Sequence, residues 1–120
     1  MLVDDFFKIK QVEENGNSAR FTVSIYSGHE IFKGHFPQQP VVPGVFALQM
    51  IKECFESLNN KKYNYCELTN CKFSNPIFPE HDKDFQIECE YELDGSILLK
   101  STIRSENTVY LTLKAKLTEI

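Results

Sequence analysis

Lys33-Gly34-His35-Phe36-Pro37-Gln38-Gln39-Pro40-Val41-Val42-Pro43-Gly44 is the stretch that decides how this sequence folds. It holds one histidine, three prolines and two glycines in twelve residues. Each proline restricts φ and removes a backbone donor, so the loop is stiff on both sides of its histidine. Pro43 presets the φ of a first helical turn. The stretch therefore predicts a rigid loop that ends where a helix begins.

A helix is predicted over residues 45–58, directly after this loop. Its N-terminal N–H groups have no partners within the helix, and Gly44, which has no Cβ, would let a carbonyl or an anion approach them. His35 and Gly44 are thus a candidate base and a candidate carbonyl-binding donor at the two ends of one loop, although a lone histidine is more often structural. The predicted apolar stripe comprises Gly44, Ala47, Leu48, Ile51, Cys54, Phe55 and Leu58, and the polar side comprises Gln49, Lys52, Glu53 and Glu56.

Alternating apolar and polar residues predict the strands of a sheet. Asn15-Gly16 and Asp94-Gly95 are typical of hairpin turns. One long helix after a hairpin, followed by further strands, predicts an α+β fold with the helix on one face of an antiparallel sheet, in a single domain over residues 1–120. The strands are expected over residues 6–12, 19–26, 63–74, 84–93, 97–105 and 108–117, and residues 33–44 are expected to form a loop.

Composition excludes several classes of function. The net charge of −4 argues against a nucleic-acid-binding role. The N-terminus does not resemble a signal peptide and no long apolar run follows, so we expect a cytoplasmic protein without a membrane span. The four cysteines lack the spacing of a metal site, and we expect them to be reduced packing residues.

Two motifs carry a resemblance to a known family. The pattern Gly34-His35-Phe36-Pro37 with Pro40-Val41-Val42-Pro43-Gly44-Val45 resembles the signature of the 3-hydroxyacyl-(acyl carrier protein) dehydratases. Phe73-Ser74-Asn75-Pro76-Ile77-Phe78-Pro79 is similar to the second segment of that family, although Glu80-His81 replaces its usual Gly-Asp. The resemblance, over residues 28–117, implies a hot-dog fold: a long central helix wrapped by an antiparallel sheet, with two protomers paired edge to edge.

The same resemblance implies roles for individual residues. His35 matches the base that removes the α-proton, with its other nitrogen held by the carbonyl of a residue around Val41, and Gly44 matches the donor that polarises the thioester carbonyl. Gln49 stands where the family has the Glu or Asp that protonates the leaving hydroxyl, and an amide cannot deliver a proton. Three outcomes stay open: His35 moves the proton alone, Glu53 one turn along supplies it, or the activity is lost.

The function implied is dehydration of 3-hydroxyacyl-(acyl carrier protein) thioesters to trans-2-enoyl thioesters in fatty acid or related acyl synthesis. No separate cofactor is expected, because phosphopantetheine arrives with the carrier protein. The expected assembly is a homodimer or higher homo-oligomer, or a heterodimer with a paralogue. One alternative is a non-catalytic acyl-carrier-binding subunit of such a heterodimer; a thioesterase is disfavoured by the Gly-His-Phe-Pro loop. The residues expected to bind substrate are Phe36, Pro37, Val41, Val45 and Phe46.

Overall fold

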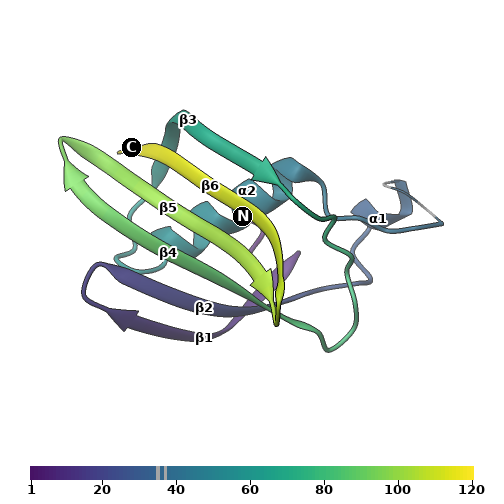
Figure 1. Ribbon diagram of the computed structural model, residues 1–120. Helices are drawn as coiled ribbons and strands as arrows, with labels where there is room; N and C mark the ends of the chain where they lie inside the picture. The colour runs from purple at the N-terminus through teal and green to yellow at the C-terminus, as the bar shows by residue number, and fades with distance from the viewer. Residues whose placement is uncertain (35, 37) are drawn as a thin grey trace.

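A computed structural model describes residues 1–34, 36 and 38–120 of the chain. Six strands form one fully antiparallel sheet with the order β1-β2-β4-β5-β6-β3 (Figure 1). The predicted α+β architecture is confirmed. The strands are β1 (Phe7–Asn15), β2 (Ser18–Ile25), β3 (Tyr63–Phe73), β4 (Asp84–Asp94), β5 (Ser96–Ser105) and β6 (Thr108–Glu119).

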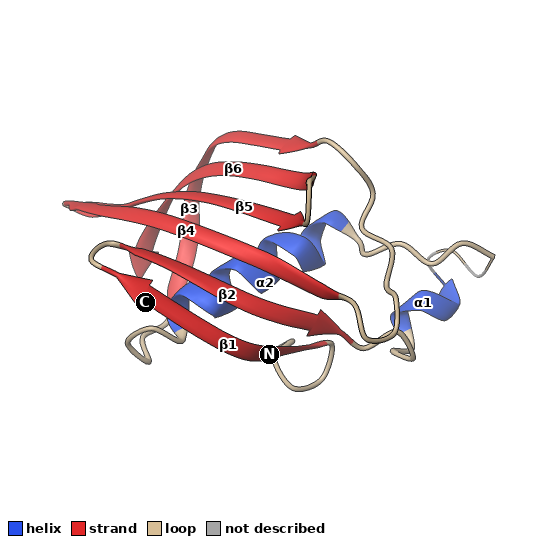
Figure 2. Cartoon of the chain, turned by 60° about the horizontal axis from the view of Figure 1, so that its bottom comes forward, coloured by secondary structure: helices blue, strands red, loops and turns tan. Residues whose placement is uncertain are grey.

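The long helix α2 (Gly44–Glu56) lies against the concave side of the sheet, as Figure 2 shows. A second helix, α1 (Ile31–Gly34), lies beyond the end of the sheet where α2 begins. The expectation of a loop over residues 33–44 is wrong at its start, because Lys33 and Gly34 belong to α1. Phe32 is buried, and its N–H donates to the carbonyl of His29 over 3.1 Å, so one apolar side chain and a local turn fix this short helix.

Both predicted hairpin turns are confirmed by their backbone angles. Gly16 has φ of +63° between β1 and β2, and Gly95 has φ of +74° between β4 and β5. These values lie in the left-handed region that side chains with a Cβ avoid, which is why Asn-Gly and Asp-Gly form such turns. The two glycines therefore fix the pairing of four of the six strands.

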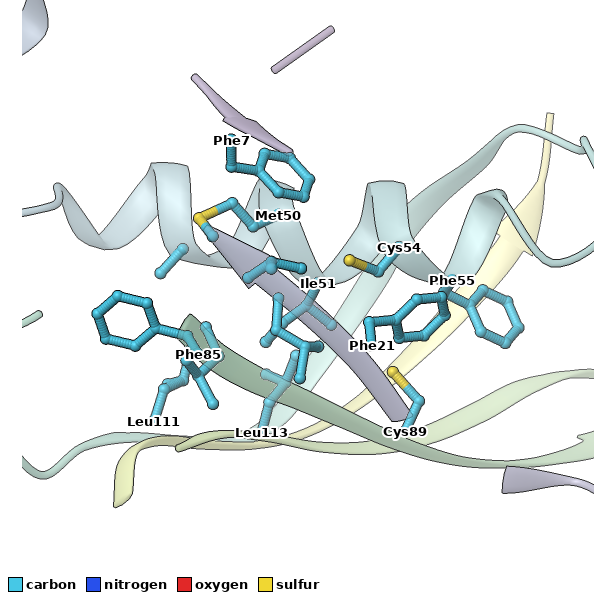
Figure 3. Close-up of a cluster of buried hydrophobic side chains, with 14 of the residues drawn as sticks. Phe7, Phe21, Met50, Ile51, Cys54, Phe55, Phe85, Cys89, Leu111 and Leu113 are labelled. Atoms are coloured by element: carbon cyan, nitrogen blue, oxygen red, sulfur yellow. The ribbon is translucent and has the colours of Figure 1, made fainter. Parts of the chain in front are cut away.

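The core lies between α2 and the sheet. Ile51 and Phe55 point from the helix toward the strands in Figure 3, and Met50, predicted outside the apolar stripe, is also fully buried. Leu48 and Leu58 are only half-buried and Gly44 is exposed, so the buried face is rotated from the predicted one. The first half of α2 is partly exposed, whereas its second half is buried apart from the half-buried Lys52.

The polar side predicted for α2 is wrong for two glutamates. Glu53 is 2% exposed and Glu56 is also buried. Burying a carboxylate is costly unless its oxygens are hydrogen-bonded, and both are satisfied by backbone N–H groups. The N–H of Tyr63 donates to Glu56 over 2.8 Å, and the amino-terminal segment supplies the donors for Glu53. Strand β3 and the amino-terminal segment therefore cover a face of α2 that is polar in sequence.

Strand β3 forms one edge of the sheet, and within the described residues β6 is its single strand partner. Two register shifts interrupt this pairing, between Tyr65 and Glu67 and between Leu68 and Asn70. The other edge is β1. Neither helix among the described residues combines the length and apolarity needed to cross a bilayer.

Candidate functional site

The two sequence motifs meet at the beginning of α2. The N–H of Val42, in the proline-rich loop, donates to the carbonyl of Ile77, in the segment after β3, over 2.9 Å. Both side chains are buried, so this contact is a fixed junction. A cavity of about 380 Å³ opens beside it, lined by Val41, Val42, Gly44, Ala47, Phe73, Ser74, Asn75, Pro76 and Ile77.

Gly44 is the first residue of α2, after Pro43 at φ −60° and ψ 143°. The N–H groups of Phe46 and Ala47 both donate to the carbonyl of Pro43, over 3.0 and 3.1 Å. Across the described part of the chain, the N–H groups of Gly44 and Val45 find no acceptor. Two free donors at a helix N-terminus can stabilise an oxygen that develops negative charge.

The ring of Phe73 covers Gly44 from the side of β3. A Cβ built on Gly44 would lie 3.1 Å from Cζ of Phe73. Since a contact this short is tighter than ordinary van der Waals packing, the lack of a side chain at Gly44 lets the ring rest against the helix backbone. Phe73 thereby forms one wall of the cavity, a role that its place in the second motif did not reveal.

An aromatic cluster supports the opposite side of the loop. The ring centroid of Phe6 lies 4.9 Å from that of Phe46 and 5.3 Å from that of His29. Nδ1 of His29 accepts the N–H of Ile31 over 3.1 Å, which leaves Nε2 to donate to Asp5 over 3.2 Å. His29 therefore has a structural position: it joins the amino-terminal segment to α1.

Gln49 donates from Nε2 to the Glu53 carboxylate over 2.8 Å. Glu53 also accepts the N–H of Leu2, at 2.9 Å from each of its oxygens, and the N–H of Val3 at 2.8 Å. All of these partners are donors, so they complement a carboxylate and leave no acceptor for a proton on Glu53. The arrangement argues against Glu53 as the acid that replaces a carboxyl group at position 49.

The predicted site residues occupy different places. His35 and Pro37 lie outside the described residues. Gly44 and Val41 line the cavity, and Phe36 and Val45 are exposed. Phe46 is half-buried in the aromatic cluster, and Gln49 lies on α2 but not among the residues that line the Gly44 cavity. One chain, in its described part, therefore does not bring Gln49 to Gly44.

Tyr65 also holds this part of the helix, although sequence patterns gave no sign of it. Its Oη donates to the carbonyl of Leu48 over 2.8 Å, which ties β3 to α2 one residue before Gln49. Burial raises the pKa of the Tyr65 phenol well above its usual value, so this hydroxyl stays a donor at all physiological pH values.

With this geometry defined, comparison with known proteins identifies the family. The family model of ApeI-like proteins, described as ApeI dehydratase, matches residues 11–114. The chain belongs to this ApeI-like dehydratase family. The resemblance predicted from the two motifs is thereby confirmed at the level of the family.

Curated relatives of this ApeI-like chain include two enzymes called 3-hydroxyacyl-(acyl-carrier-protein) dehydratase FabZ. The protein from Fusobacterium nucleatum is 27% identical over 84 residues, which cover 66% of this chain and 57% of the relative. The protein from Dechloromonas aromatica is 24% identical over 124 residues, which cover 95% of this chain and 83% of the relative. In the first of these comparisons the chain spans little more than half the length of its relative.

Solved structures show that the ApeI-like chain has the hot-dog fold. A chain of the dehydratase heterocomplex ApeI:P from Xenorhabdus doucetiae superimposes with a TM-score of 0.77 at 20% identity, covering 90% of this chain and 94% of that one. At this identity the likeness establishes the fold alone. The prediction of a central helix wrapped by an antiparallel sheet is confirmed.

Proposed function

We propose that the chain dehydrates 3-hydroxyacyl thioesters of acyl carrier protein to trans-2-enoyl thioesters. The observation that carries this proposal is the pair of unpartnered N–H groups of Gly44 and Val45 beside a cavity built from both family motifs. A thioester carbonyl bound there would have its developing charge stabilised, as α-proton removal requires. The curated FabZ relatives, whose name states this reaction, support the same substrate class.

His35 is the proposed base. Imidazole titrates near neutral pH, so it can both take and return a proton under physiological conditions. In the proposed reaction His35 accepts the α-proton, the electron pair of that C–H bond forms the new double bond, and the bond from Cβ to oxygen breaks. The same proton then goes to the departing hydroxyl, which leaves as water. Because Gln49 cannot supply a proton, this route makes His35 both base and acid.

The active unit in this proposal contains two chains. Val45 is 71% exposed, Phe73 51% and Leu68 46%, and they lie on the first turn of α2 and along the β3 edge. Leu68 and Phe73 pair with the buried residues Ala115 and Leu111, so they belong to the sheet face that covers the core. An apolar rim beside the open edge of β3 fits a second copy of this chain, paired edge to edge.

The opposite edge is not suited to such pairing. Lys8, Lys10, Glu13 and Glu14 are all exposed along β1, and charged side chains discourage strand addition at an edge. We therefore assign the subunit contact to β3. Gln49 would then meet a cavity that the partner chain contributes, which accounts for its distance from Gly44 within one chain.

A second candidate function is a non-catalytic acyl-carrier-binding subunit that pairs with an active hot-dog paralogue. The specific observation that favours it is the Gln49 amide bound to Glu53, since no carboxyl group among the described residues of α2 is left to act as an acid. The heterocomplex named in the Xenorhabdus doucetiae structure makes such a pairing a reasonable alternative.

The test is an assay of the purified chain with a 3-hydroxyacyl carrier-protein thioester, followed by mass spectrometry of the carrier-bound acyl group. Dehydration is supported if the wild type releases one water per acyl chain and His35→Ala abolishes turnover. Turnover only after a paralogous hot-dog chain is added would support the second candidate. Release of free acid would indicate a thioesterase and contradict both.

A further inference from the structure

Glu53 joins two parts of the molecule that the proposed reaction does not otherwise connect. Its carboxylate binds the backbone N–H groups of Leu2 and Val3 and the side-chain amide of Gln49. The side chain is 2% exposed, so water does not compete for these hydrogen bonds. The backbone N–H groups of Leu2 and Val3 therefore hold the Glu53 carboxylate in place independently of the Gln49 side chain.

The carboxylate decides which end of the Gln49 amide points outward. An ionised carboxylate only accepts hydrogen bonds, so the amide must turn its NH₂ group toward Glu53. Oε1 of Gln49 then faces away, and no described residue donates to it. Among the described residues no buried side-chain oxygen lacks a hydrogen-bond partner, so the unpartnered Oε1 keeps exposed surface that a ligand can reach. Without the Glu53 carboxylate, the Gln49 amide could turn either its NH₂ group or its carbonyl oxygen toward a ligand.

We propose that Glu53 is a positioning residue that makes Gln49 a hydrogen-bond acceptor for the 3-hydroxyl group of the substrate. The inference rests on the proposed function for its substrate class. In this arrangement Gln49 holds the hydroxyl group and gives it no proton, consistent with His35 as the single acid and base. Glu53 touches no substrate and acts only through the orientation of the Gln49 amide.

The chain offers a matched control in Glu56. It is a buried glutamate on the same helix, three residues further along, and its carboxylate also accepts a backbone N–H, that of Tyr63. Glu56→Gln removes the same charge from the same core without reaching Gln49. An effect of Glu53→Gln that Glu56→Gln does not share is therefore specific to the contact with Gln49.

The test measures binding of two pantetheine amide analogues by calorimetry, one with and one without a 3-hydroxyl group. Wild type, E53Q, Q49M, the double variant E53Q/Q49M and E56Q are compared, after circular dichroism shows that each is folded. The wild type is expected to prefer the hydroxylated analogue by about tenfold, the value of one hydrogen bond. E53Q and Q49M should each remove most of this preference, the double variant should remove no more than Q49M alone, and E56Q should keep it.

Several outcomes would overturn the inference: equal binding of the two analogues by the wild type, no binding of either, a full preference in E53Q, or losses that add in the double variant. A hydroxyl preference that E53Q abolishes, in a protein without dehydratase turnover, would support the inference and contradict the proposed reaction. If E53Q fails to fold, Q49M and Glu53→Asp decide the matter. The inference then requires that both lose the preference, because the shorter carboxylate keeps its charge but not its reach to Gln49.

Discussion

Gln49 and Glu53 lie one helical turn apart on α2 and share a hydrogen bond of 2.8 Å between amide and carboxylate. This contact determines whether an acidic side chain at position 49 could ionise. A glutamate there would face a carboxylate that is already held by the N–H groups of Leu2 and Val3. Two carboxylates at this separation cannot both be ionised at low cost, so one of them would keep a proton.

Gln49→Glu should therefore make stability pH-dependent. The like charges raise the pKa of one carboxyl group in the folded state above its value in the unfolded chain. The variant is then protected at low pH and loses stability as the pH rises through that raised pKa. We expect it to be near wild-type stability at pH 5 and roughly 2–4 kcal/mol less stable at pH 8, measured by urea unfolding at both pH values. The double variant Q49E/E53Q should lose this dependence, and equal destabilisation at both pH values would contradict the prediction.

Gly44→Ala should separate activity from stability. The added Cβ would approach only the outer end of the exposed Phe73 ring, which can move aside, so the free energy of unfolding should stay within about 1 kcal/mol of wild type. A methyl group at the cavity should hinder access of the thioester carbonyl to the N–H groups, lowering kcat/KM by about 10- to 100-fold. Thermal unfolding and steady-state assays measure the two effects. Full activity in the variant would show that the carbonyl binds elsewhere.

Leu68→Lys should disrupt the proposed subunit contact. Leu68 is 46% exposed on β3, and a lysine buried there without a partner should weaken association by about 100-fold or more. Light scattering with size-exclusion chromatography should show a dimer for the wild type and a monomer for the variant. Val12→Lys is the matched control, since Val12 is 44% exposed on the opposite edge strand and pairs with the buried residue Phe21. Dissociation by Val12→Lys alone would place the contact on β1 instead.

The four cysteines should differ strongly in reactivity. Burial raises the pKa of the Cys89 thiol to about 11 and also raises the pKa of the Cys54 thiol. Since the thiolate is the nucleophile, both should resist alkylation at pH 8 until the protein is unfolded. Cys66 is exposed and should react first, with the half-buried Cys71 slower. Mass spectrometry of iodoacetamide-treated protein measures the order, and early modification of Cys89 would contradict the packing of the core.

Much of the fold could be predicted because its signals are local. The Asn15-Gly16 and Asp94-Gly95 turns need a left-handed backbone that glycine adopts without strain, and strand alternation reads directly from the sequence. The family could be predicted from the two motifs, the pattern over residues 34–45 and the segment over residues 73–79, because each is a continuous run of sequence. The roles of His35 and Gln49 stay predictions, His35 because it lies outside the described residues.

The parts that could not be predicted depend on main-chain hydrogen-bond partners and on single buried side chains, neither of which leaves a periodic pattern in the sequence. Glu53 reads as a solvated residue because its partners are main-chain N–H groups of Leu2 and Val3, which leave no side-chain pattern. The burial of Glu56 could not be predicted for the same reason, because its partner is the main-chain N–H of Tyr63. The short helix α1 depends on one buried phenylalanine, which periodicity does not distinguish from a loop residue.

The position of β3 in the sheet determines the order in which the strands can pair during synthesis. β3 follows α2 directly in the chain, but among the described strands it pairs with β6, the last of the six, so it has no strand partner while β4 and β5 are being made. Such a long loop must close before its contacts form, which favours late pairing. The last edge to form is the one proposed to meet another chain. A nascent polypeptide that has not yet exposed β6 would therefore have no finished surface with which to bind a second chain.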